Sequence, residues 1–234
     1  IFRPWEKIEI NNSVRLEKQA VFKDHTVTKA GIAYLPWDPT RLYFSYGEGF
    51  KAPSMYQMYS TNGNRDLAPE TSKTWEIGAI QKVFKDKVSL SCAYFHSNFK
   101  DLIDFVYIDP VIYKGIYKNA AKASSRGIET SLKFVPIDHL SFEAGYDYTH
   151  AKQDFVDEDF VTIFRHDMIR IPKHKSFLKT KWQYKKYTVN FDLMYQGARA
   201  DRVWIFDYNT SEYVDNFVKM KPFILGNINL DYQW

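Results

Sequence analysis

The 234-residue chain has a single cysteine, little net charge, and no apolar run of about 20 residues, the length that a membrane-spanning helix needs. The lone Cys92 excludes an internal disulfide. Alternating neighbours place it on the apolar face of a strand, where we expect a small buried hydrophobe and not a nucleophile. The net charge of +4 is dispersed without a basic stripe, which argues against a nucleic-acid partner.

Apolar side chains are nevertheless abundant. Tyr, Phe and Trp make up 18% of the residues and hydrophobic residues 45%, while the mean hydropathy is negative. A β-barrel that alternates apolar and polar residues hides its membrane signal in this way, so the composition is compatible with a barrel and does not prove one.

Tight turns recur at a spacing of about 50 residues, a period that would hold two strands of about 10 residues and one long polar loop. The turns lie at Pro36–Pro39, Lys85-Asp86, Pro136–Asp138 and Lys185-Lys186, and the pattern would place another at Pro4-Trp5. Short turns on one side and long loops on the other outline an antiparallel transmembrane β-barrel of up-and-down strands.

Alternation predicts about ten strands, since side chains two apart share a face. In the clearest of them, 88–98, Val88, Leu90 and Cys92 lie opposite Ser89 and Ser91. The predicted strands are residues 7–18, 26–35, 41–47, 74–84, 88–98, 127–135, 140–149, 175–184, 187–196 and 224–234.

Alternation alone leaves a soluble sandwich or lipocalin-like barrel open. Two observations favour the membrane barrel. Aromatic residues gather beside the short turns, as an interfacial girdle would: Trp5, Trp37, Phe84, Phe134, Trp182, Tyr184, Tyr187 and Trp234. Long polar loops are expected at 48–73, 100–126, 151–172 and 199–221, and compact soluble domains seldom carry so many.

From Tyr43 to Lys73 the chain resembles the TonB-dependent outer-membrane receptors. Their barrels carry a strand ending in Gly-x-Gly-Phe-Lys/Arg-Ala-Pro, followed by Gly-Asn-x-Asp-Leu-x-Pro-Glu. The matching residues are Gly47, Gly49, Phe50, Lys51, Ala52, Pro53, Gly63, Asn64, Asp66, Leu67, Pro69 and Glu70. The likeness continues through Trp75–Gly78, Asp101–Asp104, Lys118–Ala120, Ser125–Glu129, Pro172–Lys175 and Tyr195–Gly197.

This resemblance implies that residues 1–234 form the later part of a larger barrel of about 22 strands, without its plug domain and terminal strands. It implies a location in the outer membrane, surrounded by lipid. The whole receptor would import a scarce, bulky nutrient, a ferric siderophore or cobalamin. The energy would come from the TonB, ExbB and ExbD complex, which acts through the plug. No resident cofactor or metal is implied.

The motif residues have structural interpretations that we prefer to ligand binding, and contact with the plug is the alternative. Gly47 and Gly49 would relieve crowding and permit positive φ, and Lys51 and Glu70 would pair in the lumen. The prolines would limit the loop and the strand register. The residues assigned to loop, lumen or plug contact are Gly49, Phe50, Lys51, Pro53, Asn64, Asp66, Pro69 and Glu70.

Ligand contact is expected from aromatic and arginine side chains at the loop tips. Aromatic rings are rigid apolar platforms, and arginine is a forked donor for carboxylate or catecholate oxygens. The candidates are Tyr56, Tyr59, Arg65, Tyr113, Arg199, Arg202 and Trp204.

Two rival functions remain open. A protease of about ten strands would use His166-Asp167 with Asp101 and Asp104, although no motif supports this. A passive porin would lack the receptor motifs. The acidic residues Asp154, Asp157, Glu158 and Asp159 have the oxygen ligands that Ca²⁺ takes, but we interpret them as a solvated loop.

Overall fold

The computed structural model describes residues 2–18, 24–109, 114–156, 163–209 and 212–234. Most of them lie in strands, and among them no helix is long and apolar enough to span a membrane. The elements are β1 (Phe2–Trp5), β2 (Ile8–Glu17), β3 (His25–Tyr34), β4 (Thr40–Lys51), α1 (Met55–Tyr59), β5 (Glu70–Val83), β6 (Val88–Asp109), β7 (Lys114–Ile137), β8 (Leu140–Val156), β9 (Ile163–Asp167), β10 (His174–Tyr184), β11 (Tyr187–Gln196), β12 (Arg199–Asp207), β13 (Glu212–Met220) and β14 (Phe223–Tyr232).

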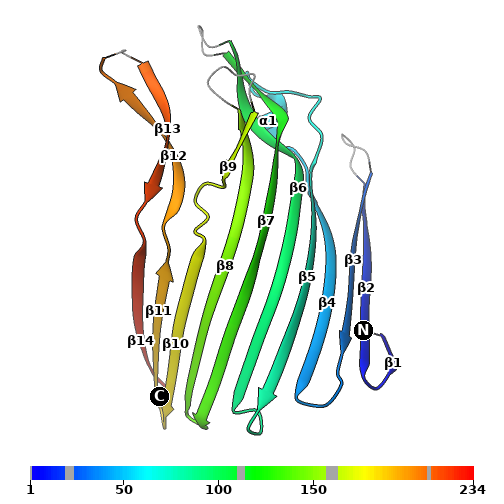
Figure 1. Ribbon diagram of the computed structural model, residues 1–234, viewed down its shortest axis with the longest axis vertical. Coiled ribbons are helices and arrows are strands. Elements are labelled where there is room, and N and C mark those ends of the chain that lie inside the picture. Colours follow the sequence, from blue (N-terminus) through cyan, green and yellow to red (C-terminus); the bar gives the residue numbers. More distant parts are fainter. Residues whose placement is uncertain (1, 19–23, 110–113, 157–162, 210–211) are drawn as a thin grey trace.

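The described strands form one antiparallel sheet in the order β1-β2-β3-β4-β5-β6-β7-β8-β10-β11-β14, and β9 pairs with β8 (Figure 1). The pair β12-β13 forms a separate hairpin between β11 and β14 in the chain. All ten predicted strands are present, so the all-β, up-and-down prediction is confirmed. The prediction missed β1, β9, β12 and β13, of which the last three lie in segments expected to be loops.

The predicted turns join neighbouring strands at one end of the sheet. In the turn after β5, Phe84, Lys85 and Asp86 have positive φ values of 54°, 54° and 67°, and Lys85's counterpart in the β10–β11 turn, Lys185, has 52°. Such left-handed residues match the twist of the flanking strands in tight hairpins. The turn expected at Pro4-Trp5 instead follows β1 at residues 6–7.

The two faces of the sheet differ as the alternation predicts. Large apolar side chains are exposed on one face: Ile77, Leu90, Leu132, Ile228 and Leu230 are examples. The girdle residues beside the turns are exposed as well, including Trp37, Phe84, Tyr184, Tyr187 and Trp234. The side chain of Trp5 lies outside the described part. An exposed apolar face with an aromatic rim is the outside of a membrane barrel.

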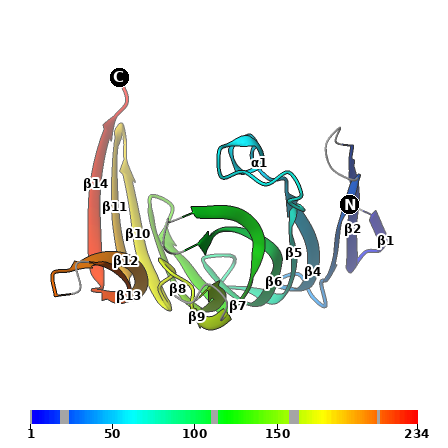
Figure 2. The same ribbon diagram turned by 90° about the horizontal axis from the view of Figure 1, so that it is seen from above.

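The opposite face is the inside of the curved sheet, and its side chains are more crowded. Ala33, Ala93, Ser97, Ala123 and Ala151 are all buried on it. Figure 2 shows the sheet as an open arc, with α1 on the concave side. Small residues line this face because inward-pointing side chains converge as the sheet curves.

Glycines on the concave face make room for aromatic rings. A Cβ on Gly78 would lie 2.5 Å from the Tyr43 ring, and one on Gly145 would lie 2.3 Å from the Phe177 ring. Neither glycine has a positive φ, and no described glycine does. Their role is therefore steric and not conformational.

Cys92 corrects one expectation. It lies on the apolar face as predicted, yet it is exposed and not buried. It pairs across the sheet with Ala79 and Thr130, which are also small and outward-facing. The outward face of a barrel is covered by lipid and not by protein, so an apolar position there has no protein core to enter.

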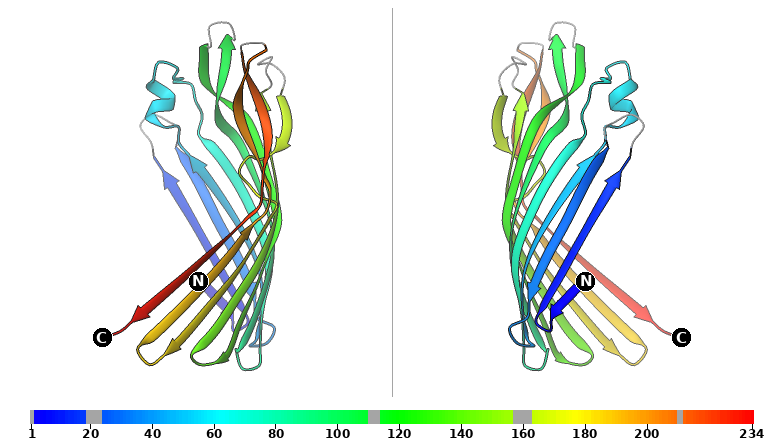
Figure 3. Two further views of the ribbon diagram at one scale, coloured as in Figure 1. Left: turned by 90° about the vertical axis from the view of Figure 1, so that its left-hand side faces the viewer. Right: turned by 90° about the vertical axis from the view of Figure 1, so that its right-hand side faces the viewer.

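The segment 100–126 also corrects the prediction, because most of it is strand and not loop. β6 has 22 residues and β7 has 24, and they remain paired out to Asp109 and Lys114. Figure 3 shows these two strands rising well above the rest of the sheet. A two-stranded ladder satisfies the backbone hydrogen bonds of a polar segment and needs no apolar face. The alternation of apolar and polar residues therefore did not predict this extension of β6 and β7.

Candidate ligand-facing site at the loop end

The loop that joins β4 to β5, residues 52–69, carries α1 and holds most of the receptor-like motif. Ser54 caps the helix: its hydroxyl accepts a hydrogen bond from the Gln57 amide at 3.2 Å, and the Gln57 side chain accepts one from the Ser54 amide at 2.8 Å. This reciprocal capping box fixes where the helix begins. One turn later the Ser60 amide donates to the Tyr56 carbonyl at 3.1 Å and ends the helix.

The loop has a small core of its own. Met58 and Leu67 are only 3% and 4% exposed, and Pro53 and Pro69 at its two ends are buried. Gly63 packs so closely on α1 that a Cβ would lie 2.6 Å from the Met58 carbonyl. The loop is therefore a packed unit, which agrees with the structural interpretation of Pro53 and Pro69.

Asn64 ties this unit to the neighbouring β6–β7 hairpin. Its side-chain amide donates to the Tyr117 carbonyl at 3.0 Å, and its side-chain oxygen accepts from the Asp66 amide at 2.9 Å. The Tyr117 amide in turn donates to the Asn62 carbonyl. Asp66 contributes its backbone to this contact, while its own side chain is exposed.

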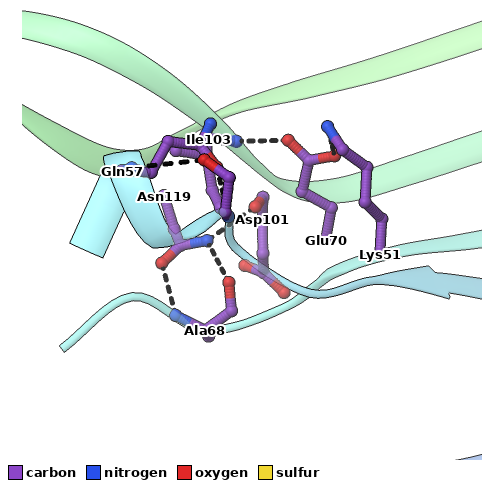
Figure 4. Close-up of polar contacts among 8 residues, drawn as sticks. Lys51, Gln57, Ala68, Glu70, Asp101, Ile103 and Asn119 are labelled. Atoms are coloured by element: carbon purple, nitrogen blue, oxygen red, sulfur yellow. Dashed lines mark hydrogen bonds and ion pairs between the residues drawn. The ribbon is translucent and has the colours of Figure 1, made fainter. Parts of the chain in front are cut away.

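Asn119 makes a second tie that the sequence prediction missed. Its side chain accepts a hydrogen bond from the Ala68 amide at 2.8 Å, and donates to the carbonyls of Ala68 and Asp101 at 2.8 and 2.7 Å (Figure 4). Asp101 has a φ of 58° and lies where the β6–β7 register shifts. The side chain of Asn119 thus supplies a hydrogen bond that the irregular ladder does not. The family-like stretch 118–120 was the only sequence signal for it.

Glu70 acts at the same irregularity from the other side. One carboxylate oxygen accepts from the Ile103 amide at 2.9 Å and the other lies 3.1 Å from the Lys51 ammonium. The predicted Lys51–Glu70 pair therefore forms. Lys51 is mostly exposed whereas the Glu70 side chain is 14% exposed, so the bond to the amide is the more sheltered of the two.

The first part of the motif serves the strand end. Phe50 stacks on His25 with ring centroids 4.8 Å apart, which joins the ends of β3 and β4. A Cβ on Gly49 would lie 2.8 Å from the Ser72 hydroxyl, so mild crowding explains this glycine. Gly47 faces nothing closer than 3.8 Å, and neither glycine has a positive φ. Positive φ was therefore the wrong reason for both, because β4 continues extended through them.

Three predicted ligand residues come together on this loop. The Arg65 guanidinium lies 5.1 Å from the centre of the Tyr59 ring, and Tyr56 meets Tyr117 edge to face at 6.2 Å. Tyr56 is 69% exposed, and its neighbour in α1, Met55, is 72% exposed. These side chains form an aromatic and cationic surface on the loop 52–69, whose helix α1 lies on the concave side of the sheet (Figure 2).

The remaining predicted ligand residues lie elsewhere. Arg199 and Arg202 belong to β12, where their guanidinium groups lie 5.4 Å from the Phe223 ring and 5.9 Å from the Phe217 ring. Trp204 is opposite Asp215 in the β12–β13 ladder, and only its backbone is described. Tyr113 lies outside the described residues. The structure therefore divides the predicted set into two groups at different parts of the sheet.

The protease constellation does not assemble. Asp101 and Asp104 lie in β6, whereas His166-Asp167 lies in β9, with β7 and β8 between them in the sheet. The His166 ring packs against the Phe217 ring at a tilt of 32°, with centroids 4.2 Å apart. The Lys173 ammonium, 2.8 Å away, holds the pKa of the Asp167 carboxyl below its usual value by hydrogen bonding and charge.

The calcium interpretation gains nothing from the structure. Asp154 pairs with Arg165 at 2.8 Å, and Asp157, Glu158 and Asp159 lie outside the described residues. Within the described ranges, no group of three or more His, Cys, Asp or Glu side chains is placed to hold a metal ion.

The family model for the TonB dependent receptor-like β-barrel matches residues 3–234. The solved structures similar to this chain include the siderophore receptor PirA from Acinetobacter baumannii, with a TM-score of 0.75, 19% identity and coverage of 98% of this chain and 38% of that one. The ferripyoverdine receptor of the outer membrane of Pseudomonas aeruginosa, bound to ferripyoverdine, has a TM-score of 0.70 and 18% identity, covering 99% and 31%.

A ferric enterobactin receptor mutant from Pseudomonas aeruginosa, PfeA, has a TM-score of 0.75 and 16% identity, covering 98% of this chain and 36% of that one. At these identities the likeness shows the fold. The chain spans about a third of the length of each of these three structures.

Proposed function

Because the chain belongs to the TonB dependent receptor-like β-barrel family of the outer membrane, we propose that it forms part of the barrel wall of an active importer of ferric siderophores. The full barrel would have about 22 strands and enclose a plug domain. The TonB, ExbB and ExbD complex would supply energy through that plug. Receptor and transporter are the activities of this family, and catalysis is not among its expected roles.

The observation that carries the proposal is the loop 52–69 on the concave side. It is a packed unit fastened to β6–β7 by Asn64 and Asn119, so its position does not depend on a ligand. Tyr56, Tyr59 and Arg65 are exposed on it, and Arg65 lies over the Tyr59 ring. A preorganised aromatic and cationic surface suits a large ligand that has both rings and anionic oxygens.

The inner wall below this surface is polar and suits contact with a folded plug. Glu129 is opposite Asp147 in the β7–β8 ladder, and Asp147 is opposite Lys175 in the next. All three lie on the concave face. Charged groups on a wall of small residues favour a polar partner in the lumen over lipid, and we propose that the plug is this partner.

Ferric siderophore is proposed over cobalamin because the similar solved structures are named as siderophore, ferripyoverdine and ferric enterobactin receptors. Cobalamin remains the second candidate ligand. The test is uptake of radiolabelled iron by cells that lack their own receptors and express the full-length protein, with a panel of ferric siderophores and with labelled cobalamin in parallel.

We expect one class of ferric siderophore to be imported, and import to stop when TonB is deleted. Replacing Arg65 by Gln together with Tyr59 by Ala should raise the KM for uptake about tenfold, since an arginine and an aromatic platform are lost together. Lys118→Gln, an exposed charge at the same end of the barrel, is the control. Uptake that persists without TonB would instead support the passive porin.

A further inference from the structure

A cavity of about 580 Å³ lies where β10 and β11 meet the segments above them. It is bounded by the connection between β9 and β10 on one side and by the base of the β12–β13 hairpin on the other. Figure 1 shows this hairpin beside β9, at the opposite end of the sheet from β1 and β2. None of the loop residues 52–69 lines the cavity, so it is separate from the surface proposed to bind the siderophore.

The cavity carries excess positive charge. Lys173, Arg199 and Lys219 line it, and Asp167 is the one carboxylate that does so among the described residues. Asp167 is already paired with Lys173 at 2.8 Å. Asp201 lies next to the lining in the sequence. Its carboxylate pairs with Arg170, in the β9–β10 connection, and accepts a hydrogen bond from the Arg202 backbone amide. Arg199 and Lys219 thus remain without a carboxylate partner in the described part of the chain.

Arg199 is held in place by stacking and not by an ion pair. Its guanidinium lies 5.4 Å from the centre of the Phe223 ring, and its Nη1 atom is buried with no hydrogen-bond partner in the described chain. On another side of the cavity, the Phe217 and His166 rings pack at a tilt with centroids 4.2 Å apart. A fixed cation beside aromatic rings is suited to an anion that is attached to a less polar body.

The cavity lies at the height of the outer edge of the membrane. From the aromatic turn at Tyr187, β11 runs to Gln196, which is about 30 Å along the strand at ~3.3 Å per residue. A strand tilt of roughly 40° reduces this to about 23 Å of height, close to the ~25 Å apolar band of such barrels. Tyr195 and His174 line the cavity and lie on the same outward face as Leu193 and Leu178.

We propose that this cavity binds a phosphate group carried by the headgroup of an outer-membrane lipid. Arg199 supplies a forked donor for phosphate oxygens and Lys219 supplies a point charge. Tyr195 and Phe217 contact the body of the lipid next to the phosphate. Such a site would fix the β12–β13 hairpin against the membrane surface, and it requires only the membrane location of the barrel, not the import of a siderophore.

The test uses the full-length protein in detergent, with three probes: lipid A bearing its two phosphates, dephosphorylated lipid A, and inorganic phosphate. Binding is measured by native mass spectrometry and by competition with a fluorescent lipid. We expect the phosphorylated lipid to bind at least tenfold more tightly than the dephosphorylated one. In the double variant R199Q/K219Q this preference should fall to within about twofold, whereas in the control variant K118Q it should stay unchanged.

Equal binding of the two lipids by the unaltered protein would overturn the proposal. So would a preference that survives in R199Q/K219Q. If inorganic phosphate competes as well as the phosphorylated lipid does, the site binds a free anion and the lipid source is wrong. The single variant K219Q changes an exposed residue, and we expect its preference for the phosphorylated lipid to fall about threefold. This variant keeps the test decisive if the double variant does not fold. Siderophore uptake by the same variants is scored separately, so failure of one proposal leaves the other standing.

Discussion

Replacing Asn119 by Ala should loosen the loop 52–69 without weakening the barrel. The Asn119 side chain makes hydrogen bonds of 2.8, 2.8 and 2.7 Å, two with Ala68 and one with the carbonyl of Asp101. Ala68 is 51 residues away in the sequence, so this side chain joins two segments that no local structure holds together. The strand pairing of β6 with β7 does not depend on it, because it is formed by the backbone.

The magnitude follows from the exposure of the partners. A single hydrogen bond contributes about 0.5–1.5 kcal/mol net, and water can replace part of the loss at an exposed site such as Ala68. We therefore expect the free energy of local opening to fall by about 2 kcal/mol. By linkage, this speeds hydrogen exchange of the Ala68 amide about 30-fold. The midpoint of global unfolding should hardly change.

Hydrogen exchange followed by mass spectrometry on peptides covering 52–69 measures this directly. The control is Asn98→Ala in β6, whose side chain forms a hydrogen bond with the nearby His96 ring at 2.9 Å and joins no distant segment. Exchange of 52–69 in Asn119→Ala within twofold of the unaltered protein would refute the reasoning. A large drop in the global unfolding midpoint would refute it as well, because the side chain would then support the sheet itself.

Three further predictions concern the same end of the barrel. Glu70→Ala should lower the free energy of unfolding by about 1–3 kcal/mol, because it removes the sheltered acceptor of the hydrogen bond from the Ile103 amide. Glu70→Gln should cost less than about 1 kcal/mol, because its side-chain oxygen can still accept that bond and the exposed ion pair with Lys51 contributes little. Thermal unfolding in detergent compares the two variants, and equal losses would contradict this. Gly63→Ala should open the loop to proteolysis, since the added Cβ meets backbone at 2.6 Å, whereas Gly47→Ala, with nothing within 3.8 Å, should not. The pKa of Asp167 is lowered in the folded chain, so its pairing with Lys173 stabilises the protein above the ordinary pKa of 3.8, and this stabilisation is lost as the pH falls below that value. Asp167→Asn should therefore flatten the dependence of the melting temperature on pH between about pH 5 and 3. An unchanged pH profile would show that this pair does not contribute.

Much of the fold could be read from the sequence because its causes are local. Alternation along a strand decides which side chains face lipid, and the tight turns set where each strand ends. The ten strands, the turn-side aromatic rim and the apolar outer face were predicted on this basis and are present. The paired segments beyond the membrane were missed, because the β6–β7 and β12–β13 ladders are held by backbone hydrogen bonds and need no hydrophobic period.

The candidate site shows the same division. The motif around Phe50 to Glu70 was recognisable as a pattern, and the Lys51–Glu70 pair was predicted and forms. The expected loop ranges already placed Tyr56, Tyr59 and Arg65 in one loop and Arg199 and Arg202 in another. The contact of Tyr56 with Tyr117 was not predictable, since it depends on how the loop 52–69 packs against the β6–β7 hairpin.

The sequence by itself determined the strands, their faces and the end of the sheet at which the short turns lie. The tertiary structure alone decided that Asn119 and Glu70 hold a distant loop, and that Arg199 and Lys219 meet at one cavity. The physical reason is that alternation is a property of neighbouring residues, whereas a side chain bonded to the backbone of a segment 51 residues away leaves no periodic signal in the chain.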